Sequence, residues 1–248
     1  MAEAPIAFFD VDGRPIAHRS RSGRSPTLLF LPGYASDMEG GKATALDAFA
    51  AAHGLAMVRF DYSGTGSSPG RFDEGTLEAW LDEALAVLDR LTKGPVILVG
   101  SSMGGWIALH VALRRPDRIA ALVGLAAAPD FTEWGFTAEQ KEMLRVQGRL
   151  ERENPYGAEP QLTTRGFWES GERLLLLRRP LDLDCPVRLI HGDSDEDVPL
   201  AIGLTLLEQV RSPDAQLLVL KGAGHRLSEP RDLAALERTV AALVEPNP

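Results

Sequence analysis

The stretch that decides the fold is Val96-Ile97-Leu98-Val99-Gly100-Ser101-Ser102-Met103-Gly104. It opens with apolar, mostly β-branched residues, which favour a buried strand. A helix is predicted from Met103 to Arg114, and the turn between strand and helix matches the pattern G-x-S-x-G. A strand, a sharp turn and a helix in this order expose the hydroxyl of Ser102 at the start of the helix. The small residues Gly100 and Gly104 let such a turn pass close to neighbouring backbone.

A second match to the pattern, Gly66-Ser67-Ser68-Pro69-Gly70, lacks this context. The residue after Ser68 is a proline, which has no N–H to offer, and no helix is predicted to begin there. The chain contains 24 glycines, so a lone match carries little weight. N-capping of the helix is the alternative role for Ser102. Its assignment as a nucleophile therefore depends on the rest of the chain.

Outward from this motif, strands and helices alternate along the chain. Predicted strands cover residues 27–31, 55–62, 95–99, 119–125, 187–190 and 217–220. Predicted helices cover residues 41–53, 76–91, 103–114, 198–210 and 233–244. This alternation indicates an α/β fold, with a mostly parallel sheet and helices on both faces. A hairpin around Asp12-Gly13 is expected to add an antiparallel edge, and residues 20–25 are expected to form a polar loop.

Residues 129–180 interrupt the alternation. They contain no clear strand, and their aromatic residues other than Phe131 are Trp134, Phe136, Tyr156, Phe167 and Trp168. We expect them to form a small helical cap over one end of the sheet, inserted in a single domain that spans residues 1–248. Trp134, Phe136 and Trp168 are candidates for lining an apolar substrate pocket. A place in the cap's own core is the alternative for each of them.

A histidine that acts together with Ser102 is expected late in the chain, because serine, acid and histidine follow one another in this order in such folds. Of the 5 histidines, only His225 follows the last candidate acid. It belongs to Gly222-Ala223-Gly224-His225-Arg226, directly after the last predicted strand. A histidine in this loop can reach over the carboxyl edge of the sheet to Ser102. A surface role is the alternative.

These motifs make the chain resemble an α/β-hydrolase over nearly its whole length. Within that superfamily it resembles the mitochondrial proteins that act as palmitoyl-protein thioesterases and acyl-glucuronide esterases. Four runs carry this resemblance: Leu31–Tyr34, Arg59–Ser68, Val99–Trp106 and Cys185–Gly192. The cap and residues 222–226 are less similar, apart from the histidine. Because no transit peptide is evident, the chain looks like a bacterial relative.

The acid is expected in the loop His191-Gly192-Asp193-Ser194-Asp195-Glu196-Asp197-Val198-Pro199. Asp195 is favoured because G-x-x-D-x-x-V-P is the form that this loop takes in many α/β-hydrolases. Asp197 is the second candidate and is better placed to cap the following helix. Asp193 lies nearest the end of the strand, and His191 is expected to be structural.

The oxyanion hole requires two backbone donors. The amide of Met103, which follows the nucleophile, is one of them. The other is expected at Tyr34, because Leu31-Pro32-Gly33-Tyr34 occupies the place where many relatives carry His-Gly-x. Pro32 replaces the usual histidine, and this does not affect donation by a later backbone amide. Asp61 is expected to be structural and to accept N–H bonds from residues 63–68.

Together these residues predict a serine hydrolase (EC 3.1) that cleaves carboxylic esters or thioesters. His225 would take the proton of Ser102, Asp195 would orient the imidazole, and an acyl-enzyme would form and be hydrolysed. No metal or organic cofactor is required. The expected substrate is a small-molecule ester or thioester, or an acylated protein. A carbon–carbon bond hydrolase, a lipase-like enzyme and a non-catalytic ligand-binding protein of the same fold are the alternatives.

Composition excludes several classes of protein. The chain has 248 residues, with 26 Lys and Arg against 35 Asp and Glu, so its net charge of −9 argues against nucleic-acid binding. The single cysteine, Cys185, excludes an intramolecular disulfide. Acidic residues and a proline interrupt the first ten positions, which does not fit a signal peptide. No apolar run is long enough to cross a bilayer, so we expect a soluble, cytoplasmic protein.

Overall fold

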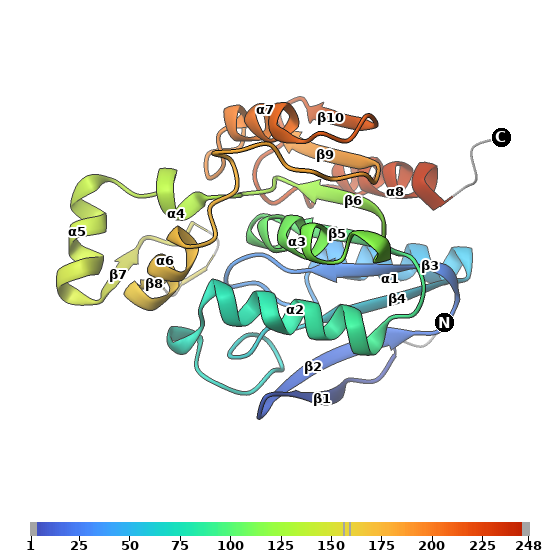
Figure 1. Cartoon of the computed structure of the whole chain (residues 1–248), viewed down its shortest axis with the longest axis horizontal. Coiled ribbons are helices and arrows are strands. Elements are labelled where there is room, and N and C mark those ends of the chain that lie inside the picture. The colour runs from blue at the N-terminus through green and yellow to red at the C-terminus, as the bar shows by residue number, and fades with distance from the viewer. Residues whose placement is uncertain (1–3, 156, 159, 245–248) are drawn as a thin grey trace.

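The computed structural model describes residues 4–155, 157–158 and 160–244. Its centre is a sheet of 8 strands in the order β1-β2-β4-β3-β5-β6-β9-β10 (Figure 1). The strands are β1 (Ala7–Val11), β2 (Arg14–Arg21), β3 (Arg24–Leu31), β4 (Leu55–Phe60), β5 (Val96–Ser101), β6 (Ile119–Leu125), β9 (Val187–Gly192) and β10 (Ala215–Leu220). β2 pairs antiparallel with β1 and β4, and every other pair in this sheet is parallel. The predicted α/β fold class is confirmed.

Helices cover both faces of the sheet, because its central strands bury side chains on both sides. In β3, Leu29 and Leu31 pack into one apolar cluster, whereas Leu28 and Phe30 pack into the other. The first cluster contains side chains of α2 (Leu77–Leu91), α3 (Met103–Arg114) and α7 (Leu200–Gln209). The second contains side chains of α1 (Gly41–His53) and α8 (Pro230–Val244). The sheet therefore lies between two helical layers.

The ends of the helices follow sequence signals. The side chain of Thr76 caps α2 by accepting a hydrogen bond from the Ala79 amide. Gly54 ends α1 in the left-handed conformation, with φ at 65°, as its position in the sequence predicts. The expected helix 198–210 begins two residues later than predicted, at Leu200, and Pro199 precedes it without a side-chain cap.

The prediction of a polar loop over residues 20–25 is wrong. β2 continues to Arg21 and β3 begins at Arg24, so only two residues connect them. The strands extend this far because their arginines have partners. The Arg21 guanidinium donates two hydrogen bonds to Asp47, and Arg19 forms an ion pair with Glu39. Gly23 also packs so closely against the backbone of Leu55 that a side chain would not fit there.

The cap segment, residues 129–180, differs from the prediction in that it contains strands. Besides α4 (Phe131–Trp134), α5 (Ala138–Gln147) and α6 (Arg165–Glu172), it forms β7 (Arg149–Arg152) and β8 (Gln161–Thr164). These pair antiparallel as a separate sheet of 2 strands. Their sequences, Arg-Leu-Glu-Arg and Gln-Leu-Thr-Thr, contain one apolar residue each. Such short polar strands give no apolar alternation to recognise.

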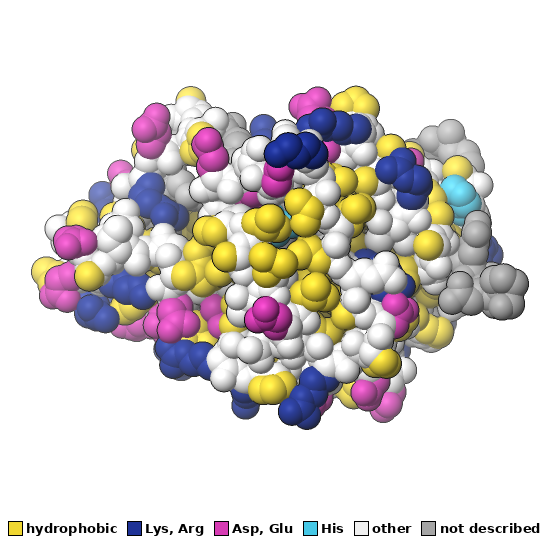
Figure 2. Space-filling model, turned by 90° about the horizontal axis from the view of Figure 1, so that it is seen from above, with side chains coloured by type: hydrophobic (Ala, Val, Ile, Leu, Met, Phe, Trp, Pro, Cys, Tyr) yellow, Lys and Arg dark blue, Asp and Glu magenta, His cyan; other side chains and the backbone are white. Residues whose placement is uncertain are grey.

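The far edge of the sheet is β10, which pairs within the sheet only with β9. Figure 2 views the molecule from the side of β10 and α7 and shows apolar side chains gathered in the middle of this face. The large exposed apolar residues of these two elements are Leu204, Leu218 and Val219. β10 is therefore less deeply buried than the central strands.

The turn between β5 and α3 depends on close packing of backbone. A Cβ atom on Gly104 would lie 2.1 Å from the carbonyl oxygen of Leu31 and 2.5 Å from that of Pro32. A Cβ atom on Gly100 would lie 2.3 Å from the carbonyl oxygen of Gly104. Helix α3 thus begins directly against the end of β3, and only glycine fits at both contacts.

We expect Gly104→Ala to lower the free energy of unfolding by about 2 kcal/mol or more, because rigid backbone must move to admit the methyl group. Gly41→Ala is the matched control. It also changes a glycine in the first turn of a helix, but a Cβ atom there meets nothing within 4 Å. Urea denaturation of both variants measures the difference. Equal stability of the two variants would contradict this account of the turn.

Candidate active site

Ser102 lies in the turn between β5 and α3, in a backbone conformation that is rare for a residue with a side chain. Its φ is 54° and its ψ is −119°. The neighbouring strand holds this conformation, because the Ser102 amide donates to the Leu125 carbonyl of β6 at 2.9 Å. The Ser102 carbonyl in turn accepts the amide of Ala128 at 3.1 Å. Strained backbone of this kind is characteristic of functional sites.

The structure brings Ser102, His225 and Asp195 together. His225 Nε2 lies 3.0 Å from Ser102 Oγ, and His225 Nδ1 lies 2.9 Å from Asp195 Oδ2. Asp195 comes from the loop after β9 and His225 from the loop after β10, so both reach the same edge of the sheet as Ser102. With Nδ1 protonated and donating to Asp195, Nε2 is free to accept the serine proton.

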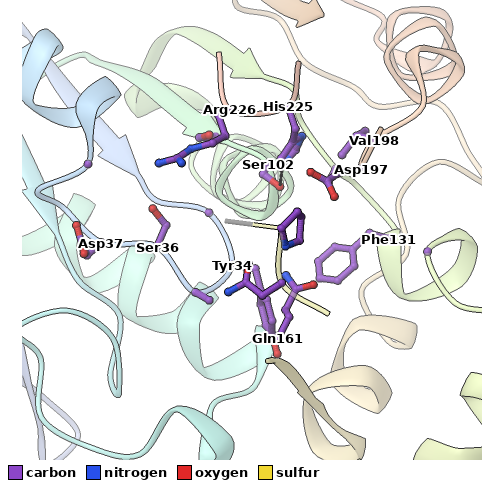
Figure 3. Close-up of a pocket in the computed structure, with 18 of the residues that line it drawn as sticks. Tyr34, Ser36, Asp37, Ser102, Phe131, Gln161, Asp197, Val198, His225 and Arg226 are labelled. Atoms are coloured by element: carbon purple, nitrogen blue, oxygen red, sulfur yellow. Dashed lines mark hydrogen bonds between the residues drawn. The ribbon is translucent and has the colours of Figure 1, made fainter. Parts of the chain in front are cut away.

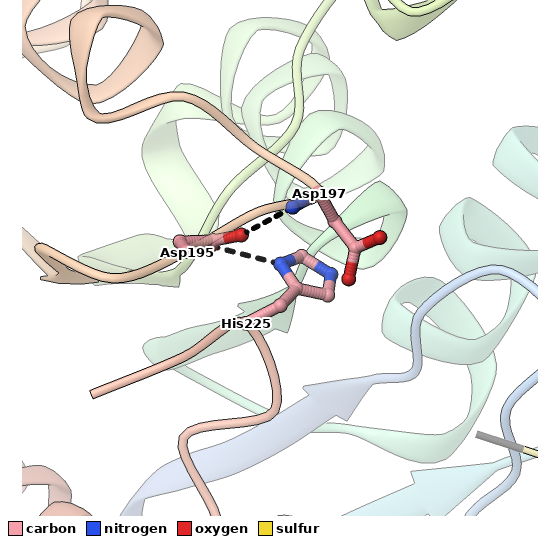
Figure 4. A group of neighbouring side chains, drawn as sticks. All are labelled: Asp195, Asp197 and His225. Carbon is pink, nitrogen blue, oxygen red and sulfur yellow. Dashed lines mark hydrogen bonds and ion pairs between the residues drawn. The ribbon is translucent and has the colours of Figure 1, made fainter. Parts of the chain in front are cut away.

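Asp195 is held by its own loop. Its Oδ1 accepts the amides of Asp197, at 3.0 Å, and Val198, at 2.8 Å, while its Oδ2 faces His225 (Figure 4). The Asp195 side chain is fully buried. Burial alone would raise the pKa of this carboxyl, but the hydrogen bond from His225, the charge of His225 and the Val198 amide outweigh it, so the pKa is lowered. Asp195 therefore stays ionised beside the imidazole.

Asp197 does not cap α7, in contrast to the expectation, because the helix begins at Leu200 after Pro199. Its carboxylate instead lies on the cavity side of the His225 ring (Figures 3 and 4). Ligand atoms of Asp195, Asp197 and His225 lie within 4.8 Å of one another, so this group could hold a cation. However, Asp195 Oδ2 and His225 Nδ1 already bond to each other.

The other polar residues of these two loops are structural. Asp193 accepts hydrogen bonds from Lys221 Nζ at 2.6 Å and from the Gly222 amide at 2.5 Å, and so joins the two loops. His191 is buried, and its Nε2 donates to the Val198 carbonyl at 2.9 Å. It also lies 3.5 Å from Asp195 Oδ2. These contacts fix the loop that carries Asp195.

Met103 follows Ser102 in the chain, and Tyr34 belongs to the loop that packs against Ser102. Met103 is the first residue of α3, so its amide has no acceptor within the helix. Gly33, next to Tyr34, packs against Ser102: a Cβ atom on it would lie 3.4 Å from Ser102 Cβ. Residues 33–36 form a turn, closed by the Ser36 amide donating to the Gly33 carbonyl at 3.2 Å. The amide of Tyr34 takes no part in closing this turn.

Asp61 and Ser68 support the wall of the site. Asp61 is buried and accepts the amides of Met38 and Ser67, each at 2.7 Å, which matches its expected structural role. Burial raises the pKa of Asp61 despite these bonds. Ser68 is buried too. Its hydroxyl donates to the Asp61 carbonyl at 2.7 Å and accepts the Ala17 amide at 2.8 Å. The second G-x-S-x-G match is therefore a structural turn.

A cavity of about 720 Å³ lies between the sheet edge and the cap and contains Ser102 and His225. Its Phe, Tyr and Trp lining residues are Phe30, Tyr34, Phe72, Phe131 and Trp134. In Figure 3, Tyr34, Gln161 and Phe131 face Ser102, His225 and Asp197 across this space. Phe131 was not singled out from the sequence, where nothing sets it apart from the other aromatic residues of the cap.

Of the three proposed pocket residues, only Trp134 lines the cavity. Phe136 and Trp168 do not line it, which corrects the expectation. Both are at most 6% exposed, and they pack with Leu144 and Leu150 in a separate apolar cluster. The cap buries them because α5, α6 and the two short strands have few other large apolar side chains with which to form a core.

Cations also line the cavity, and none was predicted. Arg152 extends from β7 over the ring of Phe136, 4.6 Å from its centre, and donates to the Gly135 carbonyl at 3.1 Å. Lys42, in the first turn of α1, donates to the carbonyl of Arg226, the residue after His225. Burial, and then the charge of Arg226, lowers the pKa of Lys42 to about 8.

Comparisons with known proteins agree with this geometry. Residues 26–146 match the family described as the alpha/beta hydrolase fold. Human mitochondrial palmitoyl-protein thioesterase ABHD10 is 37% identical over 234 residues, which cover 93% of this chain and 76% of the human protein. The structure of mouse alpha/beta hydrolase domain-containing protein 10 superposes with a TM-score of 0.91 at 35% identity, covering 97% of this chain and 98% of that one. The structure of a putative hydrolase from Agrobacterium vitis superposes with a TM-score of 0.91 at 37% identity, covering 97% of this chain and 100% of that one.

In the described part of the chain, no helix is both long and apolar enough to span a membrane.

The lowered pKa of Lys42 predicts a pH-dependent effect on stability. Below pH 8, Lys42 is charged in both the folded and the unfolded state, so burial of its charge lowers the free energy of unfolding by the full amount. Between pH 8 and about 10.4, its usual value, the folded state loses the proton first and the penalty is relieved. We therefore expect Lys42→Met to raise the Tm more at pH 7 than at pH 10, relative to the parent protein. Lys93→Met, at an exposed position, is the control. A difference in Tm that is the same at both pH values would contradict the prediction.

Proposed function

Because the chain belongs to the α/β-hydrolase fold family and is a hydrolase of esters or thioesters, we propose that Ser102, His225 and Asp195 are its catalytic triad. The observation that carries this proposal is the unbroken chain of hydrogen bonds from Asp195 through His225 to Ser102. The strained backbone at Ser102 adds support, since it holds the hydroxyl at the N-terminus of helix α3. Ser68 lacks both features.

Acylation begins when the Ser102 hydroxyl attacks the carbonyl carbon of the substrate. His225 Nε2 takes the hydroxyl proton, and the Asp195 carboxylate stabilises the imidazolium that forms. The tetrahedral oxyanion accepts hydrogen bonds from the amides of Tyr34 and Met103. As the carbon–oxygen or carbon–sulfur bond breaks, His225 returns the proton to the leaving alcohol or thiol, and the acyl group remains on Ser102.

Deacylation repeats these steps with water in place of the serine. His225 removes a proton from a water molecule, which attacks the acyl-enzyme carbonyl. The same two amides hold the second oxyanion, and Ser102 leaves with the proton from His225. The carboxylic acid is released. No step requires a metal or an organic cofactor, because each charge that develops has a partner among these residues.

The proposed substrate is a small-molecule ester or thioester, or an acylated protein. The aromatic wall formed by Tyr34, Phe72, Phe131 and Trp134 suits an apolar acyl chain. The human and mouse relatives are named as palmitoyl-protein thioesterases, which favours thioesters of this kind. Those relatives are mitochondrial, whereas the cytoplasmic location expected for this chain stays a prediction.

The nucleophile can be identified with a fluorophosphonate probe, which labels an activated serine. We expect Ser102→Ala to abolish labelling and to lower kcat for a p-nitrophenyl ester by about 10³-fold or more. Ser68→Ala is the matched control. It should still be labelled, although its Tm falls because the amide of Ala17 loses its acceptor. Labelling of the Ser102→Ala protein would contradict the assignment, and labelling of Ser102→Ala together with loss of labelling in Ser68→Ala would identify Ser68 as the nucleophile.

The acid can be identified by comparing Asp195→Asn with Asp197→Asn. The first change replaces the acceptor of His225 Nδ1 with a side chain that can donate, which favours the wrong tautomer. The loss in kcat should approach about 10⁴-fold. Asp197→Asn should retain most of its activity, because His225 Nδ1 has its partner in Asp195. Steady-state kinetics give kcat for both variants, and their Tm values show whether any loss of activity comes from lower stability. If Asp197→Asn is the inactive variant, the acid is two residues further along the chain.

A further inference from the structure

Tyr34 joins the loop that follows β3 to the cap. Its phenol donates a hydrogen bond of 2.6 Å to the Leu162 carbonyl, which belongs to the short cap strand β8. Burial is the main reason that the pKa of this phenol is raised, so the hydroxyl stays protonated and remains a donor. This bond spans 128 positions in the sequence.

The ring of Tyr34 is surrounded by aromatic side chains from both sides of the cavity. Phe167 of the cap lies 4.7 Å away between ring centres, and Phe131 lies 6.0 Å away. Phe72 and Trp80, which lie outside the cap, are 5.1 Å and 6.0 Å away. These contacts hold the ring in place by packing, whereas the hydroxyl adds a directional bond to the cap.

The backbone of this loop needs such support. Ala35, the third residue of the turn 33–36, has a φ of 54°, which is unfavourable for a residue with a Cβ atom. A turn with positive φ at this position usually carries glycine there. Further along, the Met38 amide is fixed by Asp61 at 2.7 Å. The Tyr34 hydroxyl fixes the other end of the loop, next to the nucleophile.

We propose that the Tyr34 side chain is a positioning group: by anchoring to the Leu162 carbonyl, it holds the amide of Tyr34 in the place where the oxyanion forms. The cap is then part of the catalytic machinery through one backbone carbonyl, in addition to enclosing the substrate. This inference rests on the proposed function, in which the amide of Tyr34 is an oxyanion donor. A positioning role of this kind acts on the transition state more than on the bound substrate.

The test is Tyr34→Phe, which removes the hydroxyl and keeps the ring. We expect kcat to fall about tenfold, less than the loss of a whole oxyanion donor, while KM changes by less than about twofold. Affinity for a trifluoromethyl ketone, which forms a tetrahedral adduct with the serine, should fall by the same factor as kcat/KM. Tyr34→p-aminophenylalanine, which restores a donor at the same place, should recover most of the lost kcat.

Tyr62→Phe is the matched control. Tyr62 is fully buried and stacks on Trp80, with ring centres 5.5 Å apart, but its hydroxyl has no hydrogen-bond partner among the described residues. Its removal should leave kcat and inhibitor affinity unchanged. Equal losses in both variants, a loss in Tyr34→Phe that only follows a lower Tm, or wild-type kcat in Tyr34→Phe would each overturn the proposal. An active Ser102→Ala enzyme would instead overturn the proposed function.

Discussion

The contact between the start of helix α3 and the end of strand β3 is the constraint on which the site depends. Gly104 lies so close to the carbonyl oxygens of Leu31 and Pro32 that no side chain fits between them. With the helix this near, the chain leaving β5 must turn within one residue, and Ser102 takes a φ of 54° to make that turn. The energy of a strained residue is offset by the packing of two buried elements. The proposed nucleophile, Ser102, is therefore exposed by the geometry of the core.

The remaining groups reach Ser102 because parallel strands end at a common edge. β9 and β10 run parallel to β6, so the loops that follow them lie beside the turn after β5. Each loop is then stiffened locally: Asp195 accepts two amides of its own loop, and Asp193 binds the amide of Gly222 before His225. Electrostatic preorganisation of this kind reduces the rearrangement needed when charge develops. The sheet supplies proximity, and the loops supply orientation.

The fold and the residues near Ser102 are predictable from the sequence where local pattern and fold coincide. The apolar strand before Gly100, and His225 as the one histidine after the candidate acids, predict the fold and the residues that meet at Ser102. Other elements are not predictable from the sequence, because tertiary contacts decide them. Arg21 lies in a strand because Asp47 is across from it, and the polar strands β7 and β8 carry one apolar residue each. The direction in which Trp134 and Trp168 point depends on how the cap folds, and no spacing in the sequence encodes it.

The place of β10 at the edge of the sheet has a consequence for how the protein loses activity. The loop that carries His225 is attached to a strand with one neighbour in the sheet and partly exposed side chains, whereas Ser102 follows a strand buried on both faces. Edge elements open in local fluctuations that require less free energy than global unfolding. We therefore expect the histidine to belong to a less stable cooperative unit than the serine. In rising denaturant, we expect hydrolysis to cease while the tryptophans of the core, Trp80 and Trp106, are still buried.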